Sequence, residues 1–301
     1  MMCYRLAALV AMAVTLPGIA SAQISSERWA EVDNLHERDR HGDVRAALEE
    51  LETDAARAAD RAGILWRRAR AEFSRIDLGL YAGEVSERDA LERLAEIEAM
   101  ADEAVRITGE STPAQAYFWR GAARAKQGEL RGVLNALFMA GDLRDDLRLS
   151  VAADPEYSNP YYVAGQLYQR LPGFPVSFGD TEAAVSFARL AVDLHEAAYS
   201  AGEVPLRYWD YYVRLAENLN ARSWSQRQRE RRIPTMTENR NGTDTPFERA
   251  MYYEAVAEIP DQSDQAEAKE LLNFVIRSLE SQTKLTLREE RTLDDARELA
   301  R

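Results

Sequence analysis

Apolar residues recur every three to four positions along most of this chain, which is the spacing of one face of an α-helix. In residues 64–76, for example, Trp66, Ala69, Phe73 and Ile76 fall on a single face. Alternating runs typical of strands are missing, and Ala, Leu, Glu and Arg dominate. The sequence therefore predicts an all-α protein, with helices over residues 29–41, 42–60, 64–76, 87–107, 114–130, 130–153, 206–232, 264–280 and 287–300.

Residues 161–194 read as two short amphipathic helices joined by a loop rich in Pro, Gly and Phe. Gly165 lies on the first helix, and Ala184 and Ala191 lie on one face of the second. Small residues at such spacing let a neighbouring helix approach closely, which predicts a hairpin that stacks on similar hairpins. A polar loop over 234–246 is expected to interrupt the last pair. We expect a solenoid of about five divergent helical hairpins with a C-terminal capping helix.

Four segments carry a resemblance to a known family: Trp66 with the following RRARAEF, AYFWRGAARAKQGEL at 116–130, Asp154-Pro155, and LPGFPVSFGD at 171–180. They resemble exported bacterial tetratricopeptide (TPR) repeat proteins. The match is similar to the T component associated with tripartite (TRAP) solute transporters and to the TPR domain of regulator-of-microtubule-dynamics proteins. It covers roughly residues 64–194. The resemblance implies a TPR-like solenoid that serves as a binding or assembly module and has no catalytic residues.

The first 22 residues have the pattern of a secretory signal peptide. Arg5 precedes an apolar run over 6–16, and Ala20-Ser21-Ala22 forms a cleavage site before Gln23. The chain's one cysteine, Cys3, lies inside the segment to be removed, so the mature chain is expected to have no disulfide or thiol chemistry. We expect residues 23–301 to form one helical repeat domain in the periplasm, without a transmembrane segment.

The formal net charge is −13, which disfavours general binding to nucleic acid. Against this acidic background, a basic cluster stands out at Arg227, Arg229, Arg231 and Arg232. The cluster is a candidate docking patch for an anionic partner or for lipid headgroups. The alternative is that these arginines simply lie near a helix C-terminus, where cations are favoured.

Aromatic residues concentrate on the first helix of each predicted pair, the helix that lines the concave surface of a TPR-type solenoid. Such side chains offer flat contacts to a protein partner or an apolar ligand, although they also fill gaps between helices. The loop over 171–178 is a second candidate, since it either lines a pocket or folds back on a neighbouring repeat. The binding candidates are Tyr117, Trp119, Tyr161, Tyr168, Phe174, Phe178, Tyr208, Trp209 and Tyr212.

Catalytic signatures are missing from the sequence. His36 and His41 are five residues apart, which does not place them on one helix face, and we expect both of them and His195 at the surface. No cofactor or metal is expected. The sequence favours a non-catalytic periplasmic scaffold that binds a protein, such as a periplasmic solute-binding protein. The alternative is a carrier of a small apolar ligand associated with a TRAP-type transporter. An open polar groove would favour the scaffold, and a closed, aromatic-lined cavity would favour the carrier.

Overall fold

The computed structural model describes residues 23–301, except for the side chains at positions 133, 134 and 136. In this range the secondary structure consists of thirteen α-helices and two short 3-10 helices, without strands, which confirms the all-α class. The signal peptide expected over residues 1–22 lies outside the described residues. None of the described helices combines the length and apolar character that crossing a membrane requires.

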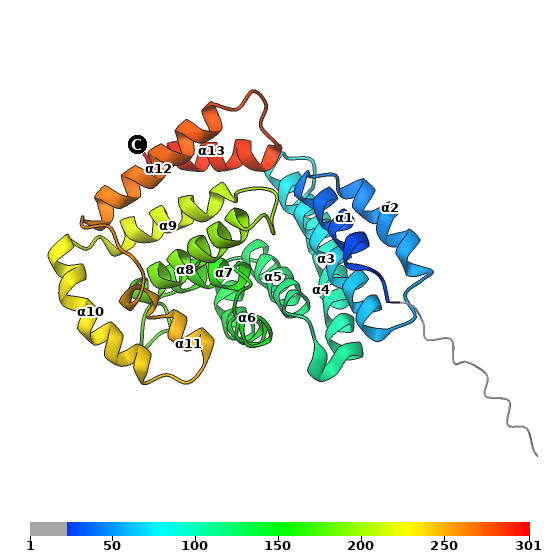
Figure 1. Cartoon of the computed structure of the whole chain (residues 1–301), viewed down its shortest axis with the longest axis horizontal. Coiled ribbons are helices and arrows are strands. Elements are labelled where there is room, and N and C mark those ends of the chain that lie inside the picture. The colour runs from blue at the N-terminus through cyan, green and yellow to red at the C-terminus, as the bar shows by residue number, and fades with distance from the viewer. Residues whose placement is uncertain (1–22) are drawn as a thin grey trace, which may run out of the picture.

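The first eight helices pack as consecutive pairs joined by short turns (Figure 1). They are α1 (Ser26–Glu37) with α2 (His41–Glu52), α3 (Ala58–Tyr81) with α4 (Glu87–Thr108), α5 (Ala114–Leu130) with α6 (Val133–Ala153), and α7 (Asn159–Arg170) with α8 (Thr181–Ser200). A short 3-10 turn, η1 (Gly109–Ser111), follows α4. Each pair also contacts the next, because α4 packs on α5, α6 on α7, and α8 on α9 (Trp209–Arg222).

The last part of the chain departs from this simple order. Helix α9 packs mainly against α12 (Asp264–Glu280) rather than against the helix that follows it. Between them lie α10 (Gln226–Asn241), α11 (Pro246–Ala250) and η2 (Tyr253–Ala255), which cover the end of the array near α8. Helix α13 (Leu287–Leu299) then turns back from α12 and contacts both α9 and α3.

Local sequence signals explain most helix starts. The Ser86 hydroxyl accepts a hydrogen bond from the backbone N–H of Asp89 and so caps α4. Asp180 caps α8 in the same way, and Thr286 forms a capping box with Glu289 at the start of α13. These caps satisfy backbone donors that have no partner within the helix.

Small residues allow α7, α8 and α9 to approach closely, as predicted. A Cβ atom at Gly165 would lie 3.1 Å from the backbone oxygen of Ala184 and 3.2 Å from the side-chain nitrogen of Asn218. The Asn218 amide donates a hydrogen bond to that same backbone oxygen at 3.1 Å. A larger side chain at position 165 would therefore push three helices apart.

The structure corrects several predicted boundaries. Helix α2 ends at Glu52 rather than at residue 60, and α3 covers Ala58–Tyr81 rather than 64–76. Two further corrections concern the C-terminal part. The single helix expected over 206–232 breaks after Arg222, where Ser223 adopts a left-handed conformation. The Trp224 N–H then donates to the carboxylate of Asp264, and the Asp264 N–H donates to the Trp224 carbonyl. The loop expected from Pro234 is wrong, because α10 continues through this proline to Asn241. Buried side chains hold α10 on both sides of Pro234, with Arg229 before it and Met236 after it.

The apolar core has two parts. The main cluster is continuous from α3 to α13 and includes Phe187, Leu215 and Leu272. A smaller cluster joins α1, α2 and one face of α3 around Val44 and Leu48. Helix α3 contributes to both clusters, so it connects the first helix pair to the rest of the array.

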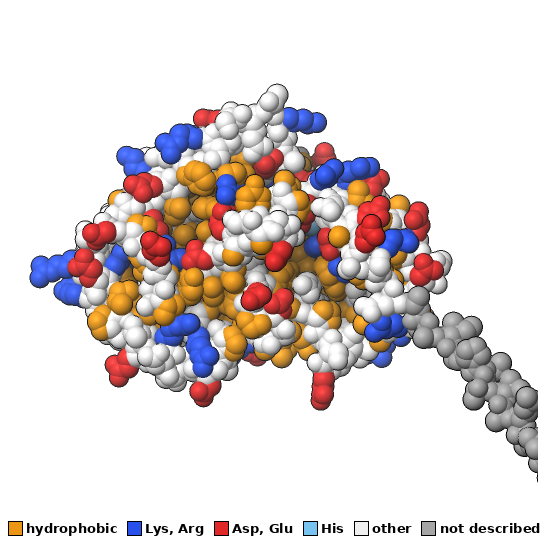
Figure 2. Space-filling view, in the orientation of Figure 1, with side chains coloured by type: hydrophobic (Ala, Val, Ile, Leu, Met, Phe, Trp, Pro, Cys, Tyr) orange, Lys and Arg blue, Asp and Glu red, His pale blue; other side chains and the backbone are white. Residues whose placement is uncertain are grey.

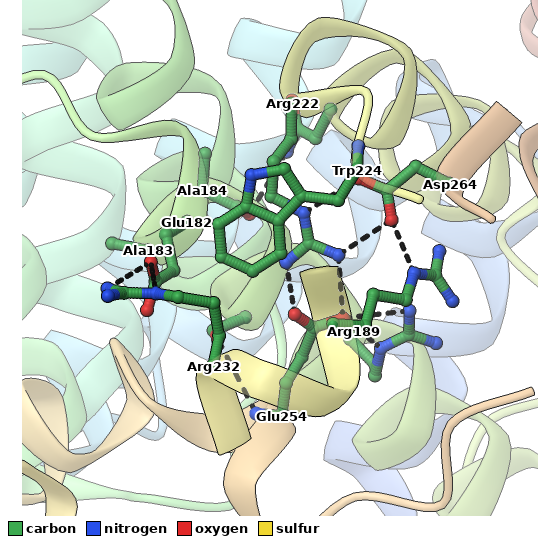
Figure 3. A network of polar contacts seen from close by, with 12 residues as sticks. Glu182, Ala183, Ala184, Arg189, Arg222, Trp224, Arg232, Glu254 and Asp264 are labelled. Atoms are coloured by element: carbon green, nitrogen blue, oxygen red, sulfur yellow. Dashed lines mark hydrogen bonds and ion pairs between the residues drawn. The ribbon is translucent and has the colours of Figure 1, made fainter. Parts of the chain in front are cut away.

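A buried ionic network holds α8, α9, α10, η2 and α12 together (Figure 3). Three arginines face three acids, so the charges balance, and every one of these side chains is nearly inaccessible to solvent. Arg222 binds both carboxylate oxygens of Asp264 at 2.8 and 2.9 Å, and it also stacks on Trp224. The six members are Arg189, Arg222, Arg229, Glu254, Asp264 and Glu267.

This network changes the interpretation of the predicted basic patch. Arg229 is buried and pairs with Asp264 and Glu267 inside the protein. Arg232 is partly buried and pairs with Glu182 of α8 at 2.7 Å. Only Arg227 and Arg231 are exposed, so the four arginines do not form one continuous surface patch.

We predict that Arg222→Met destabilises the protein by about 3–5 kcal/mol, because it leaves the buried Asp264 and Glu254 carboxylates undercompensated. Arg227→Met is the matched control, since Arg227 is an exposed arginine close by, and its effect should stay within about 0.5 kcal/mol. Urea unfolding followed by circular dichroism measures both. Equal effects of the two substitutions would show that the network does not stabilise the fold.

Candidate functional site

The inner side of the helix array forms a half-open cavity of about 1300 Å³. Helices α1, α3, α5 and α7 supply about half of its wall, and α6, α8, α9, α13 and the turns between helices supply the rest. The space-filling view shows hydrophobic side chains gathered over the middle of the molecule (Figure 2). The cavity exceeds the range of about 300–1000 Å³ that is common for small-molecule pockets.

Aromatic rings form two groups on the wall of the cavity. On the α3 and α5 side, the Trp119 ring lies 5.4 Å from that of Phe73 and 4.9 Å from that of Phe118. On the α7 and α9 side, Tyr162 stacks on Tyr211 with ring centroids 4.5 Å apart. Edge-to-face and offset contacts of this kind keep aromatic rings in defined positions. The cavity thus has rigid apolar walls.

The structure distributes the predicted aromatic residues among three environments. Trp119 and Tyr208 line the cavity. The loop residue Phe174 is 94% exposed, whereas Phe178 packs on Tyr168 and under the guanidinium group of Arg144. The others fill the space between helices or lie outside the cavity wall: Tyr161, Tyr168 and Tyr212 are buried in the core, and Tyr117 and Trp209 are partly buried.

These positions follow from the helix period. Residues on one inner helix alternate between the cavity and the neighbouring helix, so only some aromatics of each cluster reach the cavity. Tyr212, for instance, packs against Phe274 of α12 at a ring distance of 5.7 Å. The binding role of these residues stays a prediction.

One end of the cavity is basic. Two arginines of α3, Arg67 and Arg70, both contact the carboxylate of Asp33 on α1. Arg67 binds it through two nitrogens at 2.9 and 2.8 Å and also lies over the rings of Trp29 and Trp66. Burial would raise the pKa of Asp33, but the hydrogen bond from Arg67 and the charges of both arginines lower it below its ordinary value.

Polar contacts join the two ends of the array around the cavity. Arg288 of α13 pairs with Asp39 at 2.8 Å, and Arg291 pairs with Asp77 of α3. On the same side of the molecule, the Tyr81 hydroxyl donates a hydrogen bond to Asp294 at 2.9 Å. Because α13 contacts α3 in this way, the inner surface is closed at the point where the array begins and ends.

The three histidines are not at the surface, which corrects the prediction. His36 is 4% exposed and His195 is 3% exposed. His36 and His41 lie with ring centroids 5.4 Å apart, because α1 ends at Glu37 and the chain turns before α2 begins at His41. Burial lowers the pKa of His36 well below its ordinary value, and the positive charges of Arg70 and Arg288 lower it further.

Metal chemistry finds no support among the residues that the structure describes. No three His, Cys, Asp or Glu side chains in residues 23–301 are grouped as a metal ion would require. The paired rings of His36 and His41 lack a third such ligand in this part of the chain.

Several cavity residues did not emerge from the sequence, among them Asp33, Arg70 and Tyr157. A signal for Arg70 was present, because it lies four residues after Trp66 and therefore on the same helix face. Tyr157 had no such signal, since it lies in the turn between α6 and α7. Its position depends on the packing of its ring against Phe118 at 5.6 Å.

No protein-family model matches this chain, and no curated protein is significantly similar to it in sequence. The resemblance to TPR proteins therefore stays a prediction.

We predict that the free energy of unfolding falls as the pH decreases from about 6.5 to 5.5. An unfolded histidine takes up a proton in this window, whereas His36 has a lowered pKa in the folded protein and stays neutral. The contribution of one such histidine is at most about 1.4 kcal/mol per pH unit. Urea unfolding at several pH values measures the slope. His36→Phe, which keeps an aromatic ring, should reduce it, and an unchanged slope in this variant would contradict the assignment.

Proposed function

We propose that this protein is a non-catalytic carrier that holds a small, largely apolar molecule in the cavity between its inner helices. The observation that carries this proposal is the cavity of about 1300 Å³, with aromatic walls and with α13 across the ends of the array. A half-open, largely apolar space of this size suits an extended apolar ligand better than a flexible protein segment, whose backbone polar groups would need partners.

The array is best interpreted as a set of divergent TPR-like repeats. Among the described residues that line the cavity, α3, α5 and α7 supply more than their partners α6 and α8, and α4 and α12 supply none. This alternation of inner and outer helices is what a helical-hairpin solenoid of the TPR type requires. In this interpretation α13 is the capping helix, with a largely charged outer face.

A second candidate function is the docking of a protein partner, such as a periplasmic solute-binding protein. One observation favours it: the loop between α7 and α8 exposes two apolar side chains, Phe174 at 94% and Val176 at 69%. The loop is held at its base, where the N–H of Gly179 donates to the carbonyl of Pro172 at 3.0 Å. Export belongs to both proposals, and an association with a TRAP-type transporter belongs to the carrier proposal.

We predict that Ala125→Trp lowers the affinity for a neutral apolar probe, N-phenyl-1-naphthylamine, at least about tenfold. Ala125 lines the cavity, so an indole at this position occupies part of the space that the probe needs. Ala152→Trp is the matched control, because Ala152 is exposed on α6. Probe fluorescence gives the affinities. If the wild-type protein does not bind the probe, or if both variants bind it equally well, the carrier proposal is wrong.

A docking role predicts a different result. Replacing Phe174 and Val176 together with Ser should abolish crosslinking to a solute-binding protein in native cell-envelope extracts without changing probe binding. The measurement is mass spectrometry of crosslinked material from wild type and variant. Identical crosslinked proteins in both samples would eliminate this loop as the docking element.

A further inference from the structure

The basic end of the cavity has an excess of hydrogen-bond donors and of positive charge. Asp33 carries one negative charge but faces two guanidinium groups, those of Arg67 and Arg70. The Nε and Nη2 atoms of Arg67 both donate to Asp33, and its Nη1 atom donates to the backbone oxygen of Gly63 at 3.3 Å. Arg70 makes a single hydrogen bond to Asp33, at 2.5 Å. Its Nε atom is buried and has no acceptor among the described residues.

The other cations deep in the cavity wall have acids of their own. Lys126 and Arg291 share Asp77 and Glu129, so that two positive charges meet two negative charges. Arg288 pairs with Asp39. These wall segments are therefore neutralised within the protein. Among the described ion pairs of the cavity wall, the Asp33 group is the one in which positive charge is in excess.

At Arg214 the negative charge is in excess, because this one arginine pairs with both Glu217 and Asp295. Another acid on α1, Glu37, accepts a hydrogen bond from the Tyr208 hydroxyl through Oε1 at 2.7 Å, and its Oε2 is buried without a partner among the described residues. The neighbouring His36 is neutral near pH 7, because burial lowers its pKa well below its ordinary value. None of these groups supplies a second carboxylate to Arg70 in the described ion pairs.

Apolar rings surround the same position. Arg70 lies over the ring of Trp66 at 5.1 Å from its centroid, and Phe73 follows one helical turn later. Phe73 contacts Trp119, whose indole N–H is also buried without an acceptor among the described residues. Tyr157 adds a hydroxyl that remains protonated, because burial raises its pKa. Two of the polar atoms without partners on this wall, Arg70 Nε and the indole nitrogen of Trp119, are thus donors, and apolar surface lies beside them.

We propose that the cavity binds an amphipathic anion, with the carboxylate or phosphate monoester group on Arg70 and the apolar chain along Phe73, Phe118 and Trp119. This inference rests on the proposed carrier function and names the chemical class of its ligand. A ligand oxyanion at the guanidinium group of Arg70 balances the excess charge of the Asp33 group. The partly buried position strengthens this interaction relative to one in water.

The test titrates the full-length folded protein at pH 7.5 with decanoate, decyl phosphate and 1-decanol, which share one chain length. We expect at least one of the two anions to bind more tightly than the alcohol. Arg70→Gln should weaken binding of that anion at least about tenfold and leave 1-decanol unchanged. Asp33 keeps both hydrogen bonds from Arg67 in this variant, so the fold should persist, and thermal melting checks it.

Two further variants complete the experiment. Arg70→Lys retains the charge without the Nε donor and should restore part of the lost affinity for the anion. Arg170→Gln is the matched control, because Arg170 lies at the exposed edge of the same cavity. Its effect on anion binding should be within about twofold.

Three results would overturn the inference. Anions that bind no more tightly than 1-decanol, or an Arg70→Gln variant that weakens the alcohol as much as the anion, refute the anion site alone. If none of the three compounds binds, the carrier proposal fails together with it. If Arg70→Gln does not fold, two other measurements test the site: the affinity of Arg70→Lys for the anion, and the salt dependence of anion binding to the wild type. An affinity for the anion that changes in neither measurement refutes the site.

Discussion

The cavity of this protein depends on the contact between its last helix and its first ones. A row of helix pairs by itself has an open inner surface, and α13 closes that surface by reaching α3 and the turn after α1. The contacts that join the two ends are ion pairs and hydrogen bonds between residues more than 200 positions apart, such as Arg291 with Asp77 and Tyr81 with Asp294. Partly exposed ion pairs each contribute little to stability, so other contacts must also hold α13 in place.

Those other contacts come from the packing of α12 and α9. Leu293 and Ala296 of α13 are buried against the main core, and α12 in turn packs on α9. The ionic network around Arg222 and Asp264 attaches the start of α12 to the end of α9. Removing a partner from such a network is costly, because the remaining charge stays buried. A buried cluster outside the cavity therefore fixes the helix from which α13 turns back to close it.

The cavity wall combines aromatic contacts between helices with a group of residues in which positive charge is in excess. Aromatic pairs such as Tyr162 with Tyr211 hold the wall in place, and most charged groups on it are matched by partners from neighbouring helices. Against this balanced background, the two arginines that share Asp33 differ in chemistry from the rest of the wall. A large apolar cavity with one donor-rich end is the arrangement expected for a molecule with a long apolar part and a small charged group.

The sequence by itself determined the elements whose signals are local. The helical period predicted α12 to the residue and α13 to within one, and the cap at Ser86 marked the start of α4, because capping and periodicity involve residues only a few positions apart. Only the tertiary structure decided which side chains face the cavity. The continuation of α10 through Pro234, the burial of Arg229, and the meeting of His36 with His41 all follow from contacts between distant segments or from a change in chain direction. For the same reason, residue type identified the aromatic clusters, but helix packing assigned Tyr161 to the core and Trp119 to the cavity wall.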